Sequence, residues 1–168
     1  WTETTYNENV SDFQKIKLRQ RVAIDMSNRT LETKMINQPV SMPVAIAPTG
    51  LTGMQRADGE ILAAQAAEEF GIPYTLSTMS VCSIEAVAKK TTKPFWFQLY
   101  VMKDKKFMER LIDRAKEAKC SALVLTLDLQ LLGQRHKDLR NGLSTPPKLI
   151  PKHIYQVLTR PMWCLRML

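Results

Sequence analysis

Four nearly continuous apolar runs stand out along the chain and predict buried β-strands. The runs are residues 43–50, 74–79, 95–101 and 122–128. Apolar runs without alternation are typical of parallel strands that are covered on both faces. The third run nevertheless places Trp96, Gln98 and Tyr100 on one face, because side chains alternate along a strand. A buried amide without a partner costs about 1–3 kcal/mol. This face is therefore expected to be turned towards polar groups.

Helical patterns separate the four runs. The segments are residues 58–70, 83–89 and 104–119. In the first segment, Asp58 is expected to cap the amino terminus and Gly71 to end the helix. Ser83 is expected to cap the second segment, and the third carries apolar residues at helical spacing. Strands that alternate with helices in this way predict an α/β fold with a parallel sheet and right-handed crossovers.

The segments on either side of this repeat have a different character. The predicted division is into residues 1–42, 43–128 and 129–168. The first is expected to be a helical and hairpin layer, in which an alternating stretch turns at Asn37 to Pro39. The second would supply four βα units, and the third a loop and tail that contain Gly, Arg and Pro. Because 168 residues is an ordinary domain length, we expect one domain.

Composition indicates a folded protein of the cell interior. Hydrophobic residues make up 45% of the chain, and its apolar runs are far shorter than the roughly 20 residues that cross a bilayer. Because no charged-then-apolar signal segment is evident, we expect a cytoplasmic location. Cys82, Cys120 and Cys164 are widely spaced and form no CxxC pair. They predict packing thiols rather than a disulfide framework or a metal site.

The net charge of +8 raises the question of a nucleic-acid or membrane partner. Basic residues gather in residues 15–21 and again in residues 135–152. No zinc-finger, helix-turn-helix or RNA-binding signature accompanies these clusters. Charge runs of this kind are usually solvated faces, so nucleic acid is not an expected partner.

Polar side chains gather where each predicted strand ends. They are Pro48, Thr49 and Gly50, then Ser77 and Thr78, then Gln98 and Tyr100, and finally Thr126 and Asp128. In open parallel sheets and in barrels alike, ligands bind beyond the carboxyl ends of the strands. Each residue taken alone could simply begin a loop. All four ends together favour a ligand site.

Several of these segments resemble a known family. They are MPVAIAPTGLTGM, TLSTMSVCSIEAVA, FWFQLYV, LTLDLQLLGQRHKDLRNG and PP. They are similar to the amino-terminal half of the FMN-dependent α-hydroxy-acid dehydrogenases and oxidases, and most similar to the quinone-linked bacterial L-lactate dehydrogenases. The resemblance implies a flavin-binding (β/α)₈ TIM barrel, of which this chain would supply roughly the first four βα units.

The resemblance also implies which residues hold the cofactor. The backbone of Pro48, Thr49 and Gly50 would lie along the flavin ring. The side chains of Ser77, Gln98 and Thr126 would form hydrogen bonds with its pyrimidine edge. Donors at this edge stabilise the negative charge of a reduced flavin. Glycine at position 50 lets the backbone approach the ring closely.

Three further residues match the substrate and catalytic positions of the family. Tyr100 would touch the carboxylate or hydroxyl of the substrate. Arg135 would bind the substrate carboxylate, for which a planar guanidinium is suited. Asp128 would support the charge of a catalytic histidine. That histidine is expected to be followed by glycine, and neither His136 nor His153 is.

The sequence therefore predicts an FMN-dependent oxidation of a small L-2-hydroxy acid, with L-lactate as the first candidate. A quinone or another electron acceptor, a homo-oligomeric assembly and a peripheral contact with the inner membrane face are expected for the complete protein. The chain lacks the family's histidine-glycine motif, a lysine beside flavin N1 and a phosphate site, so alone it is expected to be inactive. Another flavin or phosphate-binding barrel, and a half-barrel that only binds or assembles, remain as alternatives.

Overall fold

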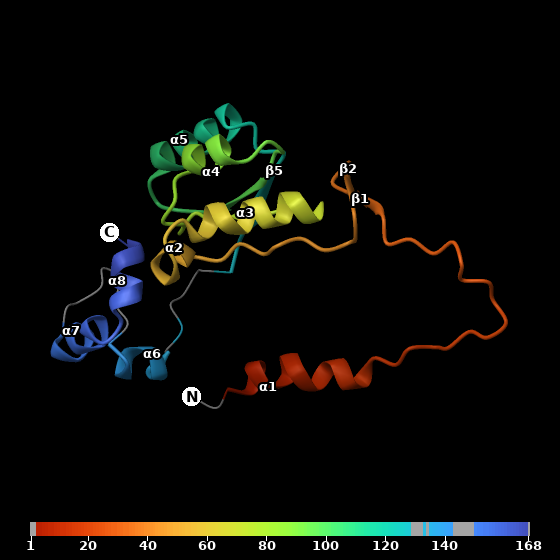
Figure 1. Ribbon diagram of the computed structural model, residues 1–168, viewed down its shortest axis with the longest axis horizontal. Coiled ribbons are helices and arrows are strands. Elements are labelled where there is room, and N and C mark those ends of the chain that lie inside the picture. The colour runs from red at the N-terminus through yellow and green to blue at the C-terminus, as the bar shows by residue number, and fades with distance from the viewer. Residues whose placement is uncertain (1–2, 129–132, 134, 143–149, 168) are drawn as a thin grey trace. The chain divides into compact units, whose positions relative to one another are not determined.

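The computed structural model describes residues 3–128, 133, 135–142 and 150–167. Contacts divide the chain into two compact units (Figure 1). One unit consists of Trp1–Thr30 and Leu132–Pro151, and the other of Leu31–Leu131 and Lys152–Leu168. The predicted hairpin therefore belongs with the strands, whereas the sequence-based division had grouped it with the amino terminus.

The larger unit is built on a parallel sheet. Its strands are β3 (Thr75–Leu76), β4 (Trp96–Tyr100) and β5 (Ala122–Thr126), in the order β3-β4-β5. Phe97 of β4 pairs with Leu76 on one side and Leu123 on the other. The strand predicted over residues 43–50 was too long: in the described residues only Ile46 pairs, in an isolated parallel bridge with Tyr74. Beyond Ile46 the chain turns away from the sheet, and Pro48 is exposed.

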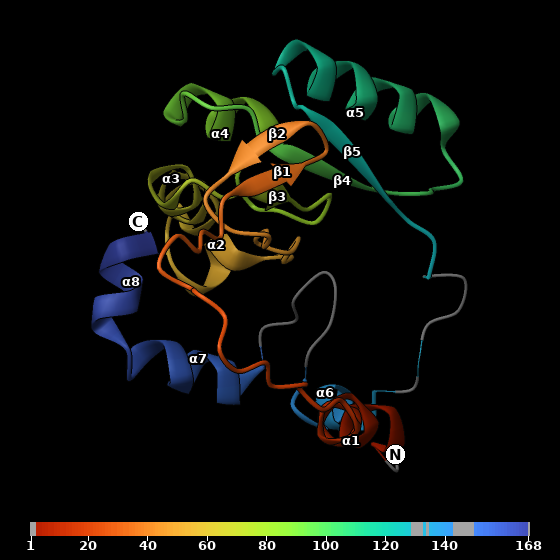
Figure 2. The same ribbon diagram turned by 90° about the vertical axis from the view of Figure 1, so that its right-hand side faces the viewer.

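The helices of this unit follow the strands in the predicted alternation. They are α2 (Thr52–Gln55), α3 (Gly59–Phe70), α4 (Ile84–Lys90) and α5 (Lys105–Glu117). Phe97 and Leu99 are buried in one apolar cluster with Ala64 of α3, Val87 of α4 and Leu111 of α5. The apolar face of β4 thus packs against helices, as its alternation predicts, and Figure 2 shows these elements from a second side.

Two of the three predicted helix-end residues, Ser83 and Gly71, agree with the structure, which adds Asp104 as a cap of α5. Ser83 Oγ accepts a hydrogen bond from Ala86 N–H (3.1 Å), and Asp104 Oδ1 accepts one from Phe107 N–H (2.9 Å). Gly71 ends α3 with a left-handed φ of 81°. The prediction that Asp58 caps α3 was wrong, because Asp58 is itself left-handed (φ 56°) and its side chain makes no cap hydrogen bond.

An antiparallel hairpin precedes the sheet. It consists of β1 (Thr33–Met35) and β2 (Gln38–Val40). The turn lies at Ile36 and Asn37, both with positive φ, whereas Pro39, which the sequence placed in the turn, belongs to β2. Trp96 Nε1–H donates to Gln38 Oε1 (3.1 Å), so the hairpin contacts the amino-terminal end of β4.

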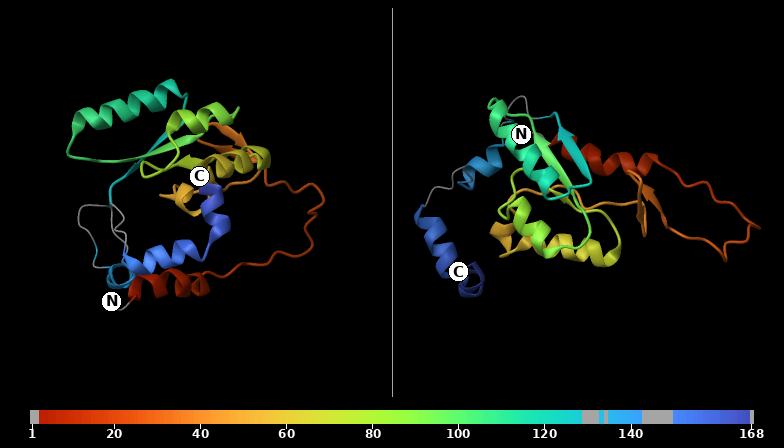
Figure 3. Two further views of the ribbon diagram at one scale, coloured as in Figure 1. Left: turned by 60° about the vertical axis from the view of Figure 1, so that its left-hand side comes forward. Right: turned by 90° about the horizontal axis from the view of Figure 1, so that it is seen from above.

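Two short helices end the described chain, α7 (Pro151–Leu158) and α8 (Pro161–Met167), and Figure 3 shows them in two further views. Trp163 Nε1–H donates to the carbonyl of Met54 (3.1 Å), which ties α8 to α2. The predicted loop and tail thus contain helix, although part of the loop lies outside the described residues.

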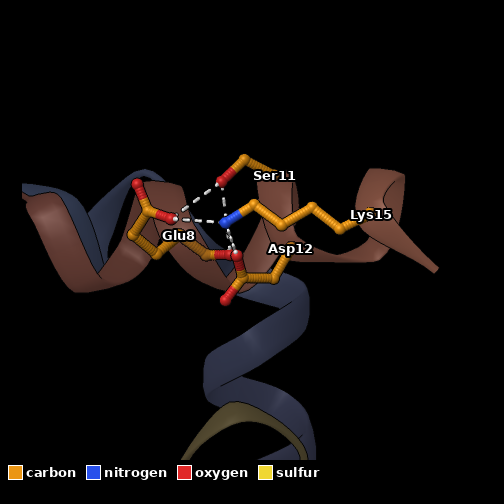
Figure 4. Close-up of polar contacts among 4 residues, drawn as sticks. All are labelled: Glu8, Ser11, Asp12 and Lys15. Carbon is orange, nitrogen blue, oxygen red and sulfur yellow. Dashed lines mark hydrogen bonds and ion pairs between the residues drawn. The ribbon is translucent and has the colours of Figure 1, made fainter.

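The smaller unit contains α1 (Thr4–Ser11), the 3₁₀ helix η1 (Asp12–Lys15) and α6 (His136–Arg140). Lys15 Nζ lies 2.6 Å from Asp12 Oδ1 and 3.8 Å from Glu8 Oε2, and Ser11 Oγ donates to the same Glu8 oxygen (3.2 Å; Figure 4). These polar contacts are exposed, so each stabilises the helix by no more than about 1 kcal/mol.

Candidate functional site

Gln98, the middle residue of β4, lies at the centre of a hydrogen-bonded row that reaches Ser77 just after β3 and Thr126 at the end of β5. Its side chain is 1% exposed. The Nε2 amide donates to Thr126 Oγ1 (2.9 Å), and Oε1 accepts from Ser77 Oγ (3.3 Å). The three residues that the sequence assigned to the flavin edge therefore lie together, one from each strand or its end. This arrangement gives the buried amide the partners that its burial requires.

Thr78 completes this row, although it was not assigned a role of its own from the sequence. Its N–H donates to Gln98 Oε1 (3.2 Å). Its hydroxyl donates to the carbonyl of Gln98 and accepts from Tyr100 N–H (3.3 Å). The side chain of Thr78 thus makes the hydrogen bonds to the backbone of β4 that a longer β3 would make. These bonds hold the carboxyl end of β4 in place. A hydroxyl at a predicted strand end was the available signal.

The backbone after the first predicted strand lies against the loop that follows β3. Leu51 N–H donates to the carbonyl of Met79 (2.9 Å). A Cβ added to Gly50 would lie 3.2 Å from Met79 Cβ, which is a tight contact. Pro48, Thr49 and Gly50 themselves are exposed. The segment predicted to lie along the flavin ring is therefore an exposed stretch next to the Ser77 loop, in which the Thr49 carbonyl accepts from Thr52 Oγ1 (3.2 Å).

Tyr100 and Asp128 lie at or just beyond the carboxyl ends of β4 and β5. Tyr100 is the last residue of β4 and pairs in register with Thr126 of β5. It is half-buried, whereas Asp128, two residues beyond β5, is exposed. The structure thus brings Tyr100 and Asp128 to the edge that carries the Gln98 row.

Arg135 belongs to the other unit. It immediately precedes α6, and its N–H donates to the carbonyl of Gly133 (3.0 Å). With its neighbours it lines an open hollow of about 820 Å³. The lining residues are Glu3, Arg135, His136, Lys137, Asp138, Arg140 and Asn141. The excess of cations in this hollow suits an anionic ligand.

Glu60 is a buried carboxylate that the sequence reading did not single out. It lies in the first turn of α3 and is 0% exposed. Its Oε1 accepts from Gly53 N–H (2.9 Å) and Val81 N–H (3.0 Å). Burial raises the pKa of Glu60, but these N–H donors and further hydrogen bonds outweigh it and bring the pKa below its ordinary value. The only signal in the sequence was a charged residue beside the apolar stripe of a helix.

Cys82 and Cys120 pack against the apolar core, as predicted for packing thiols. All three cysteines are free. Burial raises the pKa of Cys120 to about 11, and burial followed by the nearby Glu60 carboxylate raises that of Cys82 to about 11. Both thiols are therefore protonated at neutral pH. Within the part of the chain that the structure describes, no three His, Cys, Asp or Glu side chains are grouped as metal ligands would be.

The row of donors fits the edge of a flavin. A glutamine amide has two hydrogens, and only one is given to Thr126. The second, together with the hydroxyl hydrogen of Thr126, remains for an acceptor at the strand ends. Such donors match an isoalloxazine N1–C2=O edge, where negative charge develops on reduction.

The parallel sheet with helices between its strands fits part of a parallel α/β barrel, a class in which ligands bind beyond the carboxyl ends of the strands. Residues 1–168 match the FMN-dependent dehydrogenase family. The chain belongs to this family. The expected fold class, a (β/α)₈ barrel represented by its first βα units, is thereby confirmed. FMN, the cofactor that the sequence predicted, is the cofactor of the family.

Individual relatives agree with this assignment. The chain is 49% identical to an L-lactate dehydrogenase of Acinetobacter baumannii (strain ATCC 17978) over 97% of its own length and 42% of that protein. The crystal structure of the monotopic membrane protein (S)-mandelate dehydrogenase matches 99% of the chain and 44% of its own, with a TM-score of 0.90 and 32% identity. A soluble mutant of the membrane-associated (S)-mandelate dehydrogenase from Pseudomonas putida matches 92% of the chain and 44% of its own (TM-score 0.83, 34% identity). The chain thus spans less than half the length of these relatives.

Proposed function

We propose that this chain contributes the amino-terminal part of an FMN-dependent oxidoreductase that converts L-lactate to pyruvate. The observation that carries this proposal is the row Ser77, Gln98 and Thr126, which presents hydrogen-bond donors at the strand ends. Membership of the FMN-dependent dehydrogenase family supplies the cofactor class. The relatives, an L-lactate dehydrogenase and an (S)-mandelate dehydrogenase, support the dehydrogenation of a 2-hydroxy acid as the reaction.

The cofactor-binding residues divide into two groups. Gln98 and Thr126 donate to the pyrimidine edge of the flavin, and Ser77 orients the Gln98 amide through its own hydrogen bond. The exposed backbone of Pro48, Thr49 and Gly50 lies along the ring. FMN, when bound, takes up the two electrons that leave the substrate carbon.

The remaining residues act on the substrate. The hydroxyl of Tyr100 donates to the carboxylate or hydroxyl of the 2-hydroxy acid, and the Arg135 guanidinium pairs with the carboxylate. Asp128 accepts a hydrogen bond from a histidine supplied by a later part of the barrel. The carboxylate keeps that imidazole in the tautomer that takes the substrate proton, and stabilises the imidazolium that forms.

The choice of L-lactate over mandelate rests on similarity. The lactate dehydrogenase of A. baumannii is 49% identical, whereas the mandelate dehydrogenase structures are 32% and 34% identical. The test is anaerobic mixing of a full-length flavoprotein carrying this sequence with each acid. Bleaching of the flavin by L-lactate, faster than by (S)-mandelate, supports the proposal. A colourless protein, or a flavin that neither acid reduces, contradicts it and favours a half-barrel that only binds or assembles.

A quinone acceptor, a homo-oligomeric assembly and peripheral membrane contact belong to the same proposal. Among the described helices, none combines the length and the apolar character needed to span a bilayer. Exposed apolar side chains do gather on α7 and α8, among them Ile154, Leu158 and Leu165, next to the exposed Arg160 and Arg166. Such helices suit the surface of an anionic bilayer. The membrane enzyme among the structural relatives agrees with this arrangement.

Liposome co-sedimentation tests the membrane contact. We expect the full-length protein to sediment with anionic vesicles at low salt and to be released as salt screens the charges. A Leu158→Glu, Leu165→Glu variant should stay in the supernatant. Equal sedimentation of the variant would locate the contact elsewhere, and no sedimentation of the parent protein at low salt would remove it.

A further inference from the structure

Glu60 joins the two loops that carry the proposed flavin-facing backbone. Gly53, whose N–H donates to Glu60 Oε1, lies three residues after Gly50. Val81, whose N–H donates to the same oxygen, lies two residues after Met79. A single buried oxygen atom therefore holds one backbone amide from α2, which directly follows the Gly50 loop, and one from the loop after β3. The loops touch again at Leu51 N–H and the carbonyl of Met79 (2.9 Å).

The space around this carboxylate is filled. A Cβ added to Gly53 would lie 2.7 Å from Val81 Cβ and 2.8 Å from Glu60 Oε2, distances that no side chain could accept without a shift. Glycine at position 53 is therefore required for the two loops to approach each other around Glu60. The spacing of the loops depends on this contact.

The second carboxylate oxygen sets Glu60 apart from an ordinary structural glutamate. Oε2 is buried and accepts no N–H or O–H hydrogen bond in the described part of the chain, and the Cys82 thiol is the further group that interacts with the carboxylate. A carboxylate whose second oxygen meets only a weak thiol donor is costly to bury. Burying this carboxylate adds little to the stability of the fold. Its hydrogen bonds do, however, fix the geometry between the two segments that carry the proposed ligand site.

We propose that Glu60 is a positioning residue for FMN: its carboxylate fixes the spacing between the loop of Gly50 and the loop of Ser77 and Met79, and so shapes the backbone surface that meets the flavin ring. This inference rests on the proposed function, since it concerns the same cofactor site. Glu60 does not touch the flavin itself. It acts through the amides of Gly53 and Val81.

Three variants of α3 separate this role from simple stabilisation. Glu60→Ala removes the acceptor of both amides. Glu60→Gln keeps an oxygen in the place of Oε1 and is the conservative rescue. Glu68→Ala is the matched control, because Glu68 also accepts a backbone N–H, that of Thr92 (3.0 Å), but holds the segment that precedes β4.

The first measurement needs no flavin. Amide hydrogen exchange in the chain should become faster at Gly53 and Val81 in Glu60→Ala, remain near the parent rate in Glu60→Gln, and accelerate only around Thr92 in Glu68→Ala. Unchanged exchange at Gly53 and Val81 in Glu60→Ala would overturn the inference, whatever the function of the protein.

The second measurement is the affinity for FMN in a full-length protein that carries this sequence. We expect the FMN dissociation constant to rise about tenfold or more in Glu60→Ala, because hydrogen bonds to a charged group are lost. It should stay within about threefold of the parent value in Glu60→Gln and Glu68→Ala. The visible absorption band of the bound flavin should shift only in Glu60→Ala.

The outcomes distinguish the two ideas. If the parent protein binds FMN and Glu60→Ala binds it equally well with the same spectrum, the role of Glu60 is wrong while the proposed function stands. If Glu68→Ala loses as much affinity as Glu60→Ala, the effect is general destabilisation and the inference also fails. A parent protein that binds no FMN overturns the proposed function and this inference together.

Discussion

At the scale of single residues, Gln98 shows how one side chain serves both fold and site. Its two polar ends join Ser77 and Thr78 on one side to Thr126 on the other. The sequence predicts only that this amide faces something polar. The structure adds that most of its hydrogen bonds are already made within the protein, so the residue is pre-organised before any ligand binds.

The variant Gln98→Leu tests the role of Gln98 in the fold and its role in the site. The replacement fits the volume, but it leaves Thr78 N–H without its acceptor, so we expect a loss of about 1–3 kcal/mol in the free energy of unfolding. In a full-length protein it should also weaken FMN binding and slow reduction of the flavin by L-lactate. Urea unfolding and stopped-flow absorbance measure the two effects.

The control is Gln65→Leu, the same substitution at an exposed glutamine of α3 whose amide donates to the carbonyl of Lys90 (3.0 Å). It should change the free energy of unfolding by less than about 1 kcal/mol and leave the rate of flavin reduction unchanged. Normal reduction kinetics in Gln98→Leu would remove Gln98 from the flavin edge.

At the scale of elements, the helix caps give a matched pair of aspartates. Asp104 accepts Phe107 N–H at the start of α5, whereas Asp58 precedes α3 without a side-chain cap. We expect Asp104→Ala to cost about 1 kcal/mol. Asp58→Gly should cost nothing or stabilise slightly, because its left-handed φ of 56° suits glycine. Thermal or urea unfolding of both variants measures the two changes in stability. An equal loss of unfolding free energy at the two positions would contradict the assignment of Asp104, and not Asp58, as a cap.

Helices α4 and α5 are joined by a bidentate ion pair that should respond to acid. Arg114 Nε lies 2.6 Å from Glu85 Oε1, and Nη2 lies 2.8 Å from Oε2. The hydrogen bonds from Arg114 come first among the causes that lower the pKa of Glu85 from 4.5 to about 2. Because the folded pKa is depressed, the stabilisation is present above pH 4.5 and is lost as the pH falls towards 2.

A double-mutant cycle with Glu85→Gln and Arg114→Gln measures this pair. Both side chains are about half exposed, at 54% and 41%, so solvent screens the interaction. We therefore expect a coupling energy below about 1 kcal/mol at pH 7. It should decrease when unfolding is repeated near pH 2.5. A coupling that does not change between these pH values would show that the charge of Glu85 is not its source.

At the scale of the whole molecule, β5 leaves part of the barrel surface uncovered. Leu123 and Leu125 pair with the buried Phe97 and Leu99, yet they are 48% and 52% exposed, and Leu127 beyond them is 67% exposed. Among the described residues, β5 has a partner strand only in β4. An apolar face and an open strand edge of this kind require further βα units.

We therefore expect residues 1–168 alone not to oxidise L-lactate, since loss of the catalytic base alone removes roughly 10²–10⁴-fold of rate. A separate chain that supplies the remaining βα units of a relative should restore flavin colour and lactate-dependent dye reduction. A Leu125→Asp variant should prevent this rescue. Lactate oxidation by residues 1–168 alone would instead turn attention to the His136 and Arg135 pair.

Local signals in the sequence determined the order of the elements and most of their ends. Alternation along FWFQLYV separated the helix-packed face of β4 from the face of Gln98, and Ser83 and Gly71 marked helix ends. These features depend on neighbours within a few residues, which a sequence displays directly. The parallel direction of the strands also followed from the repeat of strand and helix.

Only the tertiary structure decided which of these residues meet. Residues 43–50 contribute a single bridge because strand pairing depends on a partner distant in sequence. Asp58 fails as a cap because its backbone adopts a left-handed conformation that no short pattern announces. Glu60 was not singled out from the sequence, and it is a buried link because the fold brings Gly53 and Val81 to it. Contacts of this kind join loops from different strands, so they arise from the packing of the whole unit rather than from any local pattern.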